Sequence, residues 1–182
     1  MSGLNIAVLG ATGAVGQQIV DLLAERKFPL KNLTLLSSPR SAGRQINVGG
    51  KSYIVQEVSD ESFDGVDLAF FAAGGGVSRK WVEAANKAGA LVIDNTSAFR
   101  MEPDVPLVVP EINGEDVAWH HGIISNPNCA TIIGLVPTWP LHKIAGVTRM
   151  VVSTYQAASG AGAPGMADLE AEIAAMGKGE PL

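Results

Sequence analysis

The chain has 182 residues, of which 47% are hydrophobic and 17% are charged, and its formal net charge is −5. This length is enough to bury a core and predicts one domain, or one domain with part of another. The acidic balance and the lack of basic runs argue against nucleic acid as a partner. A single cysteine excludes a disulfide scaffold, and no apolar run approaches the length of a membrane span. We therefore expect a soluble cytoplasmic protein.

The first half of the chain alternates predicted strands with predicted helices. Helical spacing of apolar residues predicts helices over residues 17–26 and 78–88, the second with Ser78 as its N-cap and Gly89 as its stop. Strand-like apolar runs lie at residues 4–9, 33–36, 67–73 and 91–94. This succession predicts an α/β fold with a Rossmann-like, doubly wound, mostly parallel sheet.

Two parts of the chain are less regular. Residues 45–48 and 53–58 are predicted to pair as a hairpin through two glycines. Beyond residue 100, prolines interrupt short predicted strands at 107–109 and 123–124. The elements predicted after these prolines are a helix at 130–143, a long strand at 149–156 and a helix at 166–176. One strand and one helix cannot close a second sheet, so they either extend the first domain or begin a longer one.

A glycine-rich stretch follows the first predicted strand and precedes the first predicted helix. In such a GxxGxxG turn the first glycine permits a tight turn, the second lets a pyrophosphate approach, and the third allows close helix–strand packing. The helix N-terminus then faces the negative phosphates. A glycine-rich turn without a ligand is the alternative. The residues predicted to contact a dinucleotide here are Gly10, Thr12, Gly13, Ala14, Val15 and Gly16.

The end of the second predicted strand distinguishes NAD from NADP. An NAD site has an acidic residue about 20 residues past the glycines, which bonds the ribose 2′-hydroxyl. This chain instead has Ser37, Ser38, Arg40 and Ser41, with no carboxylate nearby. A guanidinium and hydroxyl groups suit a 2′-phosphate, so NADP is the predicted cofactor. The alternative is that Arg40 is only a solvated surface charge.

The only cysteine, Cys129, directly precedes a predicted helix. Backbone N–H groups at a helix start favour a thiolate over a thiol. Pro127 stiffens the approach to this position, and Asn128 places an amide donor beside the sulfur. A reactive nucleophile is therefore one interpretation, and a buried cysteine that acts as a small hydrophobe is the other.

Six motifs together resemble aspartate-semialdehyde dehydrogenase over nearly the whole chain. The most specific are Asn-Pro-Asn-Cys at 126–129 and the stretch around Gln156 at 153–162. The other four are GATGAVG at 10–16, SPRSAG at 38–43, DNTSAFR at 94–100 and VVPEIN at 108–113.

The resemblance implies NADPH-dependent reductive dephosphorylation of L-aspartyl 4-phosphate to L-aspartate 4-semialdehyde, on the route to lysine, threonine and methionine. It implies that Cys129 forms a thioester, that Arg100 and Asn128 hold the substrate phosphate, and that Gln156 positions the substrate. It places Ser159 and Gly160 near the nicotinamide, and it implies no metal.

The resemblance also implies a domain organisation. Residues 1–129 would be the NADP-binding domain, and residues 130–182 would begin an incomplete α+β catalytic and dimerisation domain. The full-length enzyme would be a homodimer that acts on a small molecule, without nucleic acid or membrane. Family members are nearly twice as long, and their catalytic histidine is expected beyond this chain, because His120, His121 and His142 do not match its position. The chain alone is therefore expected to bind NADPH but to turn over poorly.

Three alternatives remain at this stage. N-acetyl-γ-glutamyl-phosphate reductase shares the fold, the cofactor and the chemistry, but it is expected to have Pro-Gly-Cys-Tyr where this chain has Pro127-Asn128-Cys129-Ala130. Glyceraldehyde-3-phosphate dehydrogenase would need an acidic residue after the second strand. A non-catalytic NADP-binding relative is the alternative from another functional class.

Overall fold

The computed structural model describes residues 3–181, which belong to two compact units that divide between Met150 and Val151. The helix that follows Asn128 is part of the first unit. The functional division that we predict at residue 129 stays a prediction, since it concerns chemistry rather than compactness.

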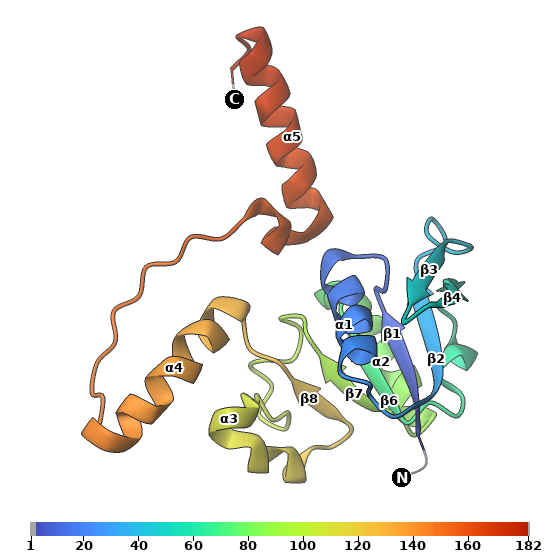
Figure 1. Cartoon of the computed structure of the whole chain (residues 1–182), viewed down its shortest axis with the longest axis horizontal. Helices are drawn as coiled ribbons and strands as arrows, with labels where there is room; N and C mark the ends of the chain where they lie inside the picture. Colours follow the sequence, from blue (N-terminus) through green and yellow to red (C-terminus); the bar gives the residue numbers. More distant parts are fainter. Residues whose placement is uncertain (1–2, 182) are drawn as a thin grey trace. The chain divides into compact units, whose positions relative to one another are not determined.

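A six-stranded, wholly parallel sheet forms the centre of the first unit (Figure 1). The strand order is β5-β2-β1-β6-β7-β8, so the chain moves outward from β1 in one direction and then crosses back to β6. The strands are β1 Leu4–Leu9, β2 Leu30–Ser37, β5 Gln56–Glu57, β6 Leu68–Phe71, β7 Leu91–Asp94 and β8 Ile123–Ser125. This confirms the predicted doubly wound sheet. Ligands of such sheets bind at the carboxyl ends of the strands where the order reverses, here beside β1 and β6.

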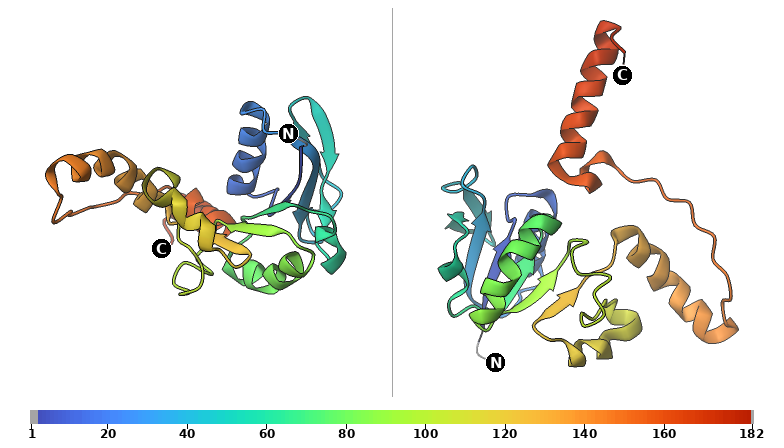
Figure 2. Two further views of the ribbon diagram at one scale, coloured as in Figure 1. Left: turned by 90° about the horizontal axis from the view of Figure 1, so that it is seen from below. Right: turned by 180° about the vertical axis from the view of Figure 1, so that it is seen from behind.

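Helices α1 (Ala14–Glu25) and α2 (Gly75–Lys87) cover opposite faces of this sheet, as the front and back views show (Figures 1 and 2). The alternation of side chains along β1 explains the two layers, because Ile6 and Val8 pack in the cluster on the α1 face. Ala7 and Leu9 pack with Trp81 and other residues of α2 on the other face. Burial on both faces is the reason that β1 reads as a continuous apolar run.

The hairpin differs from its prediction in one arm. Strand β3 (Gln45–Val48) pairs with β4 (Lys51–Ile54), and the turn glycines both have positive φ, as a two-residue type I′ turn requires. The predicted second arm at 53–58 is wrong, because it divides at Val55. Val55 is buried in the core, and the chain then continues as β5 along the edge of the main sheet.

The start of α2 also differs from its prediction. Ser78 is not the N-cap: the helix begins at Gly75, with Gly74 as its N-cap at φ 102°, and Ser78 is buried inside it. Glycine is a poor helix former, so the sequence pattern predicted a helix start after the glycines. Gly89 does follow the helix with positive φ, as predicted.

Residues 101–128 contain the short helices α3 (Pro110–Asn113), with proline in its first turn, and η2 (Gly114–Trp119). Another short 3₁₀ helix, η1 (Asp60–Phe63), precedes β6. The predicted strand at 107–109 reduces to a single bridge between Leu107 and Ser125, whereas the strand at 123–124 is confirmed as β8. Helix α4 (Cys129–Ala145) confirms the predicted helix and includes two internal prolines.

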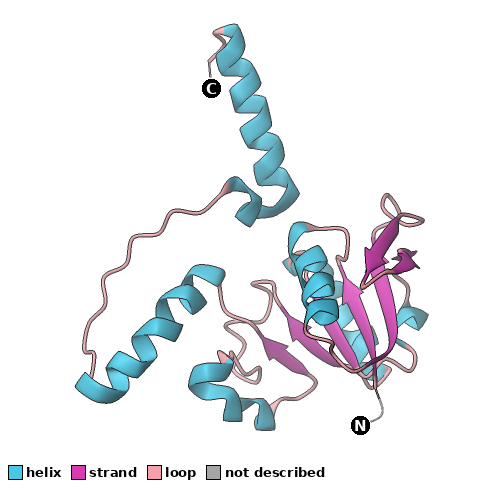
Figure 3. Ribbon diagram, in the orientation of Figure 1, coloured by secondary structure: helices cyan, strands magenta, loops and turns pink. Residues whose placement is uncertain are grey.

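The predicted strand at 149–156 is wrong. Figure 3 shows residues 147–157 as loop, and the side chains of Val151 and Tyr155 are 80% and 99% exposed. A strand is stabilised by pairing with another strand, and no strand within the described residues pairs with this segment. The second unit otherwise consists of η3 (Ala158–Ala161) and α5 (Gly162–Lys178), which confirms the helix predicted at 166–176.

Candidate active site

The glycine-rich turn joins β1 to α1 at the carboxyl edge of the sheet. Gly10 has φ 93°, and a Cβ atom there would lie 2.8 Å from the carbonyl carbon of Ala72. A Cβ at Gly16 would lie 2.7 Å from the carbonyl carbon of Gly10 and closer still to its oxygen. The protein itself therefore requires glycine at both positions, for the turn and for helix–strand packing.

Gly13 is different, and the difference suggests a ligand. Its φ is −81°, and a Cβ there would have its nearest contact at 3.4 Å, from Gly10 O. No protein atom forces glycine at this position. The open space at the N-terminus of α1 fits a phosphate group that approaches the backbone N–H donors.

The end of β2 lies against this turn. Thr12 Oγ1 and Ser37 Oγ are 3.0 Å apart and share a hydrogen bond. Ser38 and Arg40 are exposed in the following turn, and Ser41 is half-buried, with its N–H bonded to Ser38 O at 2.9 Å. No acidic residue occurs between positions 37 and 44. The structure thus brings the predicted 2′-phosphate residues to the edge that carries the glycine turn.

A second glycine-rich turn reaches the same edge, and sequence analysis missed it. Residues 74–76 follow β6, the neighbour of β1, and open helix α2. A Cβ at Gly74 or Gly76 would meet nothing within 4 Å. The available signal was a run of three glycines between a buried strand and a helix, which lacks the familiar spacing. We expect this turn to border the cofactor together with the first one.

Arg100 lies in the loop after β7, facing the loop after β8. Its Nε donates to Asn126 O at 2.9 Å, and its Nη2 donates to Asn95 O at 3.4 Å. Asn126 Nδ2 also donates to Asn95 Oδ1. Two of the five N–H donors of this guanidinium are used in these bonds, which orient a planar fork that matches phosphate.

Cys129 occupies the first residue of α4, and its side chain is exposed. The prediction of a cysteine at a helix start is confirmed, and the buried alternative is wrong. Asn128 is the N-cap, with its Oδ1 accepting from the Ala130 N–H at 2.9 Å. Its amide nitrogen is then the group that would donate to a substrate. Since Asn126 precedes Cys129 by three residues, the structure links Arg100 to the loop that carries the nucleophile.

Gln156, Ser159 and Gly160 belong to the second unit. The Gln156 side chain lies over Gly160, since a Cβ there would be 2.7 Å from Gln156 Cγ. Their roles toward the residues of the first unit stay predictions.

The histidines make local contacts. His120 Nδ1 accepts from the Gly122 N–H at 3.0 Å, and the ring of His142 stacks on Trp139 with centroids 5.6 Å apart. Neither contact involves a residue of the candidate site.

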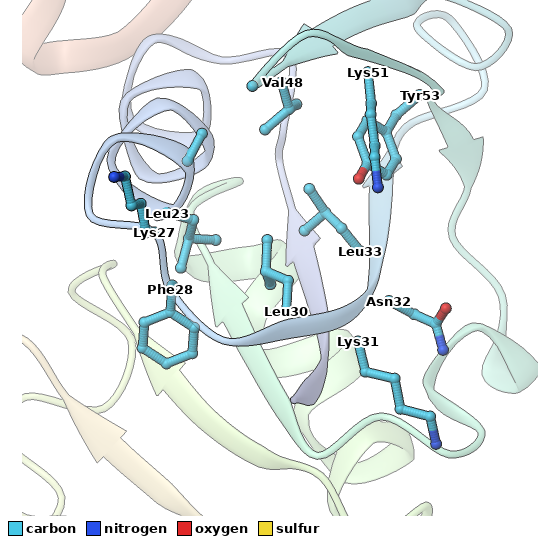
Figure 4. A pocket seen from close by; sticks show the side chains of 12 residues that line it. Leu23, Lys27, Phe28, Leu30, Lys31, Asn32, Leu33, Val48, Lys51 and Tyr53 are labelled. Carbon is cyan, nitrogen blue, oxygen red and sulfur yellow. The ribbon is translucent and has the colours of Figure 1, made fainter. Parts of the chain in front are cut away.

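A separate hollow of about 200 Å³ opens between the end of α1, the start of β2 and the β3–β4 hairpin (Figure 4). The residues that line it include the apolar side chains of Leu30 and Leu33. It is also lined by three lysines, Lys27, Lys31 and Lys51. Leu30 begins β2, so the hollow lies at the amino end of that strand. It contains none of the predicted site residues and is not part of the candidate site.

Within residues 3–181, no helix is both long and apolar enough to cross a bilayer. Among the same described residues, no group of three or more His, Cys, Asp or Glu side chains could hold a metal ion.

Comparison with known proteins identifies the family. The family model described as semialdehyde dehydrogenase, NAD binding domain, matches residues 5–120. The aspartate-semialdehyde dehydrogenase of Synechocystis sp. is 52% identical over 169 residues, covering 93% of this chain and 50% of that protein.

Solved structures agree with this match. The crystal structure of aspartate semialdehyde dehydrogenase II complexed with ASA from Vibrio cholerae superposes with a TM-score of 0.90 at 45% identity, covering 100% of this chain and 55% of that one. The enzyme with NADP from Candida albicans gives a TM-score of 0.68 at 29% identity, covering 80% and 48%. The chain spans about half the length of these relatives. It belongs to the semialdehyde dehydrogenase family.

Proposed function

We propose that this chain is the cofactor-binding and nucleophile-bearing part of an aspartate-semialdehyde dehydrogenase, which converts L-aspartyl 4-phosphate into L-aspartate 4-semialdehyde with NADPH. The observation that carries the proposal is the bond from Arg100 Nε to Asn126 O, because it ties a guanidinium to the loop that leads to exposed Cys129. A cation that can hold phosphate thus accompanies a nucleophile that can accept an acyl group. The proposal also includes a homodimer, a cytoplasmic location and a place on the route to lysine, threonine and methionine.

The residues of the glycine turn and of the β2 end fit the proposed cofactor. Gly13 leaves room that no protein atom fills, and Thr12 connects the turn to Ser37 at the strand end. Ser38, Arg40 and Ser41 supply hydroxyl groups and a guanidinium where an NAD site would have a carboxylate. We expect them to hold the 2′-phosphate, with Ser159 and Gly160 near the nicotinamide.

The chemistry begins at the Cys129 sulfur, which attacks the acyl carbon of the substrate. As the carbon–sulfur bond forms, the bond from that carbon to the phosphate oxygen breaks. Phosphate leaves with the bonding electrons, and a thioester remains on Cys129. Arg100 and the Asn128 amide hold the leaving phosphate, while Gln156 orients the rest of the substrate. NADPH, when bound, would supply the hydride for reduction of the thioester, and the Cys129 thiolate would be the leaving group as the aldehyde forms.

A comparison of two acyl phosphates tests the substrate. The assay uses NADPH and a form of the protein that is extended to the full length of its relatives. This form should prefer L-aspartyl 4-phosphate over N-acetyl-γ-glutamyl phosphate by at least about 100-fold in kcat/KM. A preference in the opposite direction would overturn the proposal, and reduction of neither substrate would favour the non-catalytic alternative.

Arg40→Ala tests the cofactor. We expect it to weaken NADPH binding about 10- to 100-fold and to leave NADH binding unchanged, because only NADPH carries the 2′-phosphate. Calorimetric titration of the chain with each cofactor measures both constants. Arg26→Ala, at an exposed arginine that follows α1, is the matched control. Equal weakening of both cofactors by Arg40→Ala would contradict the assigned role.

A further inference from the structure

The loop that carries Arg100 is held by two consecutive side chains of helix α2. Residues 95–101 form neither helix nor strand, so their path depends on a few backbone bonds and on side-chain contacts. Ser78 holds the first part of the loop and Arg79 holds the second part. The reaction proposed above uses neither residue.

Ser78 acts through a buried network at the end of β7. Its hydroxyl donates to Asp94 Oδ1 at 2.8 Å, and Thr96 Oγ1 lies 2.8 Å from Asp94 Oδ2. Thr96 Oγ1 also accepts the N–H of Ala98 at 3.1 Å. Asp94, Ser78 and Thr96 are at most 9% exposed, so these bonds form away from solvent. A satisfied buried network of this kind defines one geometry for the backbone that leaves the strand.

Arg79 contacts residues on both sides of Arg100 in the sequence. Its Nη2 donates to Ala98 O and lies 3.3 Å from Glu102 Oε1, and its guanidinium stacks 5.3 Å from the centre of the Phe99 ring. The Glu102 N–H closes the loop on Phe99 O at 3.2 Å. An exposed ion pair alone adds little stability, but three contacts to Ala98, Phe99 and Glu102 restrict the intervening backbone.

We propose that Arg79 is a positioning residue that sets the direction of the Arg100 guanidinium and thereby the affinity of the site for a phosphate group. This inference rests on the proposed function of Arg100. A displacement of about 1 Å in such a group is enough to cost up to about 100-fold in a catalysed step. Helix α2 begins at the glycine turn of residues 74–76, which follows β6, the neighbour of β1. The same helix therefore borders the cofactor edge and supports the phosphate site.

Nuclear magnetic resonance of the whole chain tests this inference. The Nε–H signal of Arg100 reports its bond to Asn126 O, and a titration with inorganic phosphate followed at that signal reports anion binding. In Arg79→Leu we expect the signal to shift and the Kd for phosphate to rise about tenfold. The Kd for NADPH should change less than twofold. Arg79→Lys keeps the charge beside Glu102 and should restore only part of the phosphate affinity, because it lacks the planar fork.

A matched variant on the same helix provides the control. Lys87 pairs with Glu83 at 2.7 Å, which lowers the pKa of Glu83 and raises that of Lys87, and neither residue contacts the Arg100 loop. Lys87→Leu therefore removes an exposed ion pair of α2 and should leave the Arg100 signal in place. Since the Arg79 side chain is 58% exposed, Arg79→Leu should remain folded.

The outcomes separate this inference from the proposed function. An Arg100 signal and a phosphate Kd that do not change in Arg79→Leu would overturn the positioning role. A second outcome combines two measurements: the Arg100 signal shifts in Arg79→Leu, but in the wild-type chain the same signal does not respond to phosphate. That result would support the positioning role of Arg79 and refute the phosphate role of Arg100.

Discussion

Gly16→Ala is expected to distort the cofactor turn and to lower the free energy of unfolding of the first unit by about 3 kcal/mol. The reason is steric, because the new Cβ would lie 2.7 Å from the carbonyl carbon of Gly10 and 2.9 Å from Cα of Ala11, both in the backbone. Neither atom can rotate away as the end of a side chain can. Urea unfolding measures the stability loss, and NADPH titration should show no binding at concentrations that saturate the wild-type chain.

Gly13→Ala is the matched comparison. Its Cβ would have its nearest protein contact at 3.4 Å, so the stability should change by less than about 1 kcal/mol. NADPH binding should still weaken by at least about tenfold, because the methyl group would enter the space reserved for the pyrophosphate. Unchanged NADPH affinity in Gly13→Ala would mean that the cofactor does not approach this turn.

Joining the chain to the rest of a relative is expected to produce turnover that the chain alone lacks. The fusion partner is the stretch that the Synechocystis enzyme carries beyond the matched residues. In the chain alone, α4 has no buried residue, and its Ile133 and Ile144 are 73% and 86% exposed. We expect the added stretch to cover these side chains and to supply the general acid–base group, which contributes roughly 100- to 10,000-fold to a rate.

The oxidation of L-aspartate 4-semialdehyde with NADP⁺ and phosphate, followed by absorbance, measures this turnover. The chimera should exceed the chain alone by at least about 100-fold. Within the chimera, Cys129→Ser should lower kcat at least about 1,000-fold and leave NADPH binding unchanged, because the residue lies outside the glycine turn. Equal activity of the chain and the chimera would show that residues 1–182 already contain the acid–base group.

Much of the fold could be predicted because most strands of the main sheet have a strong local pattern. The buried strand at residues 4–9 and the strand at 91–94 coincide with β1 and β7. The helix at 130–143 also followed from sequence, to within two residues at each end. Apolar continuity and the glycine stop after α2 are local signals.

The errors lie where a distant contact outweighs a local preference. Ser78 looks like an N-cap in sequence, but the bond to Asp94, sixteen residues away, places it inside α2. Residues 149–156 have the composition of a strand, yet they form a loop because no strand within the described residues pairs with them. The interruption of the hairpin arm at Val55 likewise depends on a tertiary contact, because this residue packs into the core.

The sequence by itself determined the alternation of the main strands and helices through α4, the glycine turn and the position of Cys129 at a helix start, because these depend on neighbouring residues. Only the tertiary structure showed that Arg100 bonds to the carbonyl of Asn126 and that Ser78 and Arg79 hold its loop. Parallel pairing of β7 with β8 sets those loops side by side, and such pairing joins residues that local patterns cannot connect.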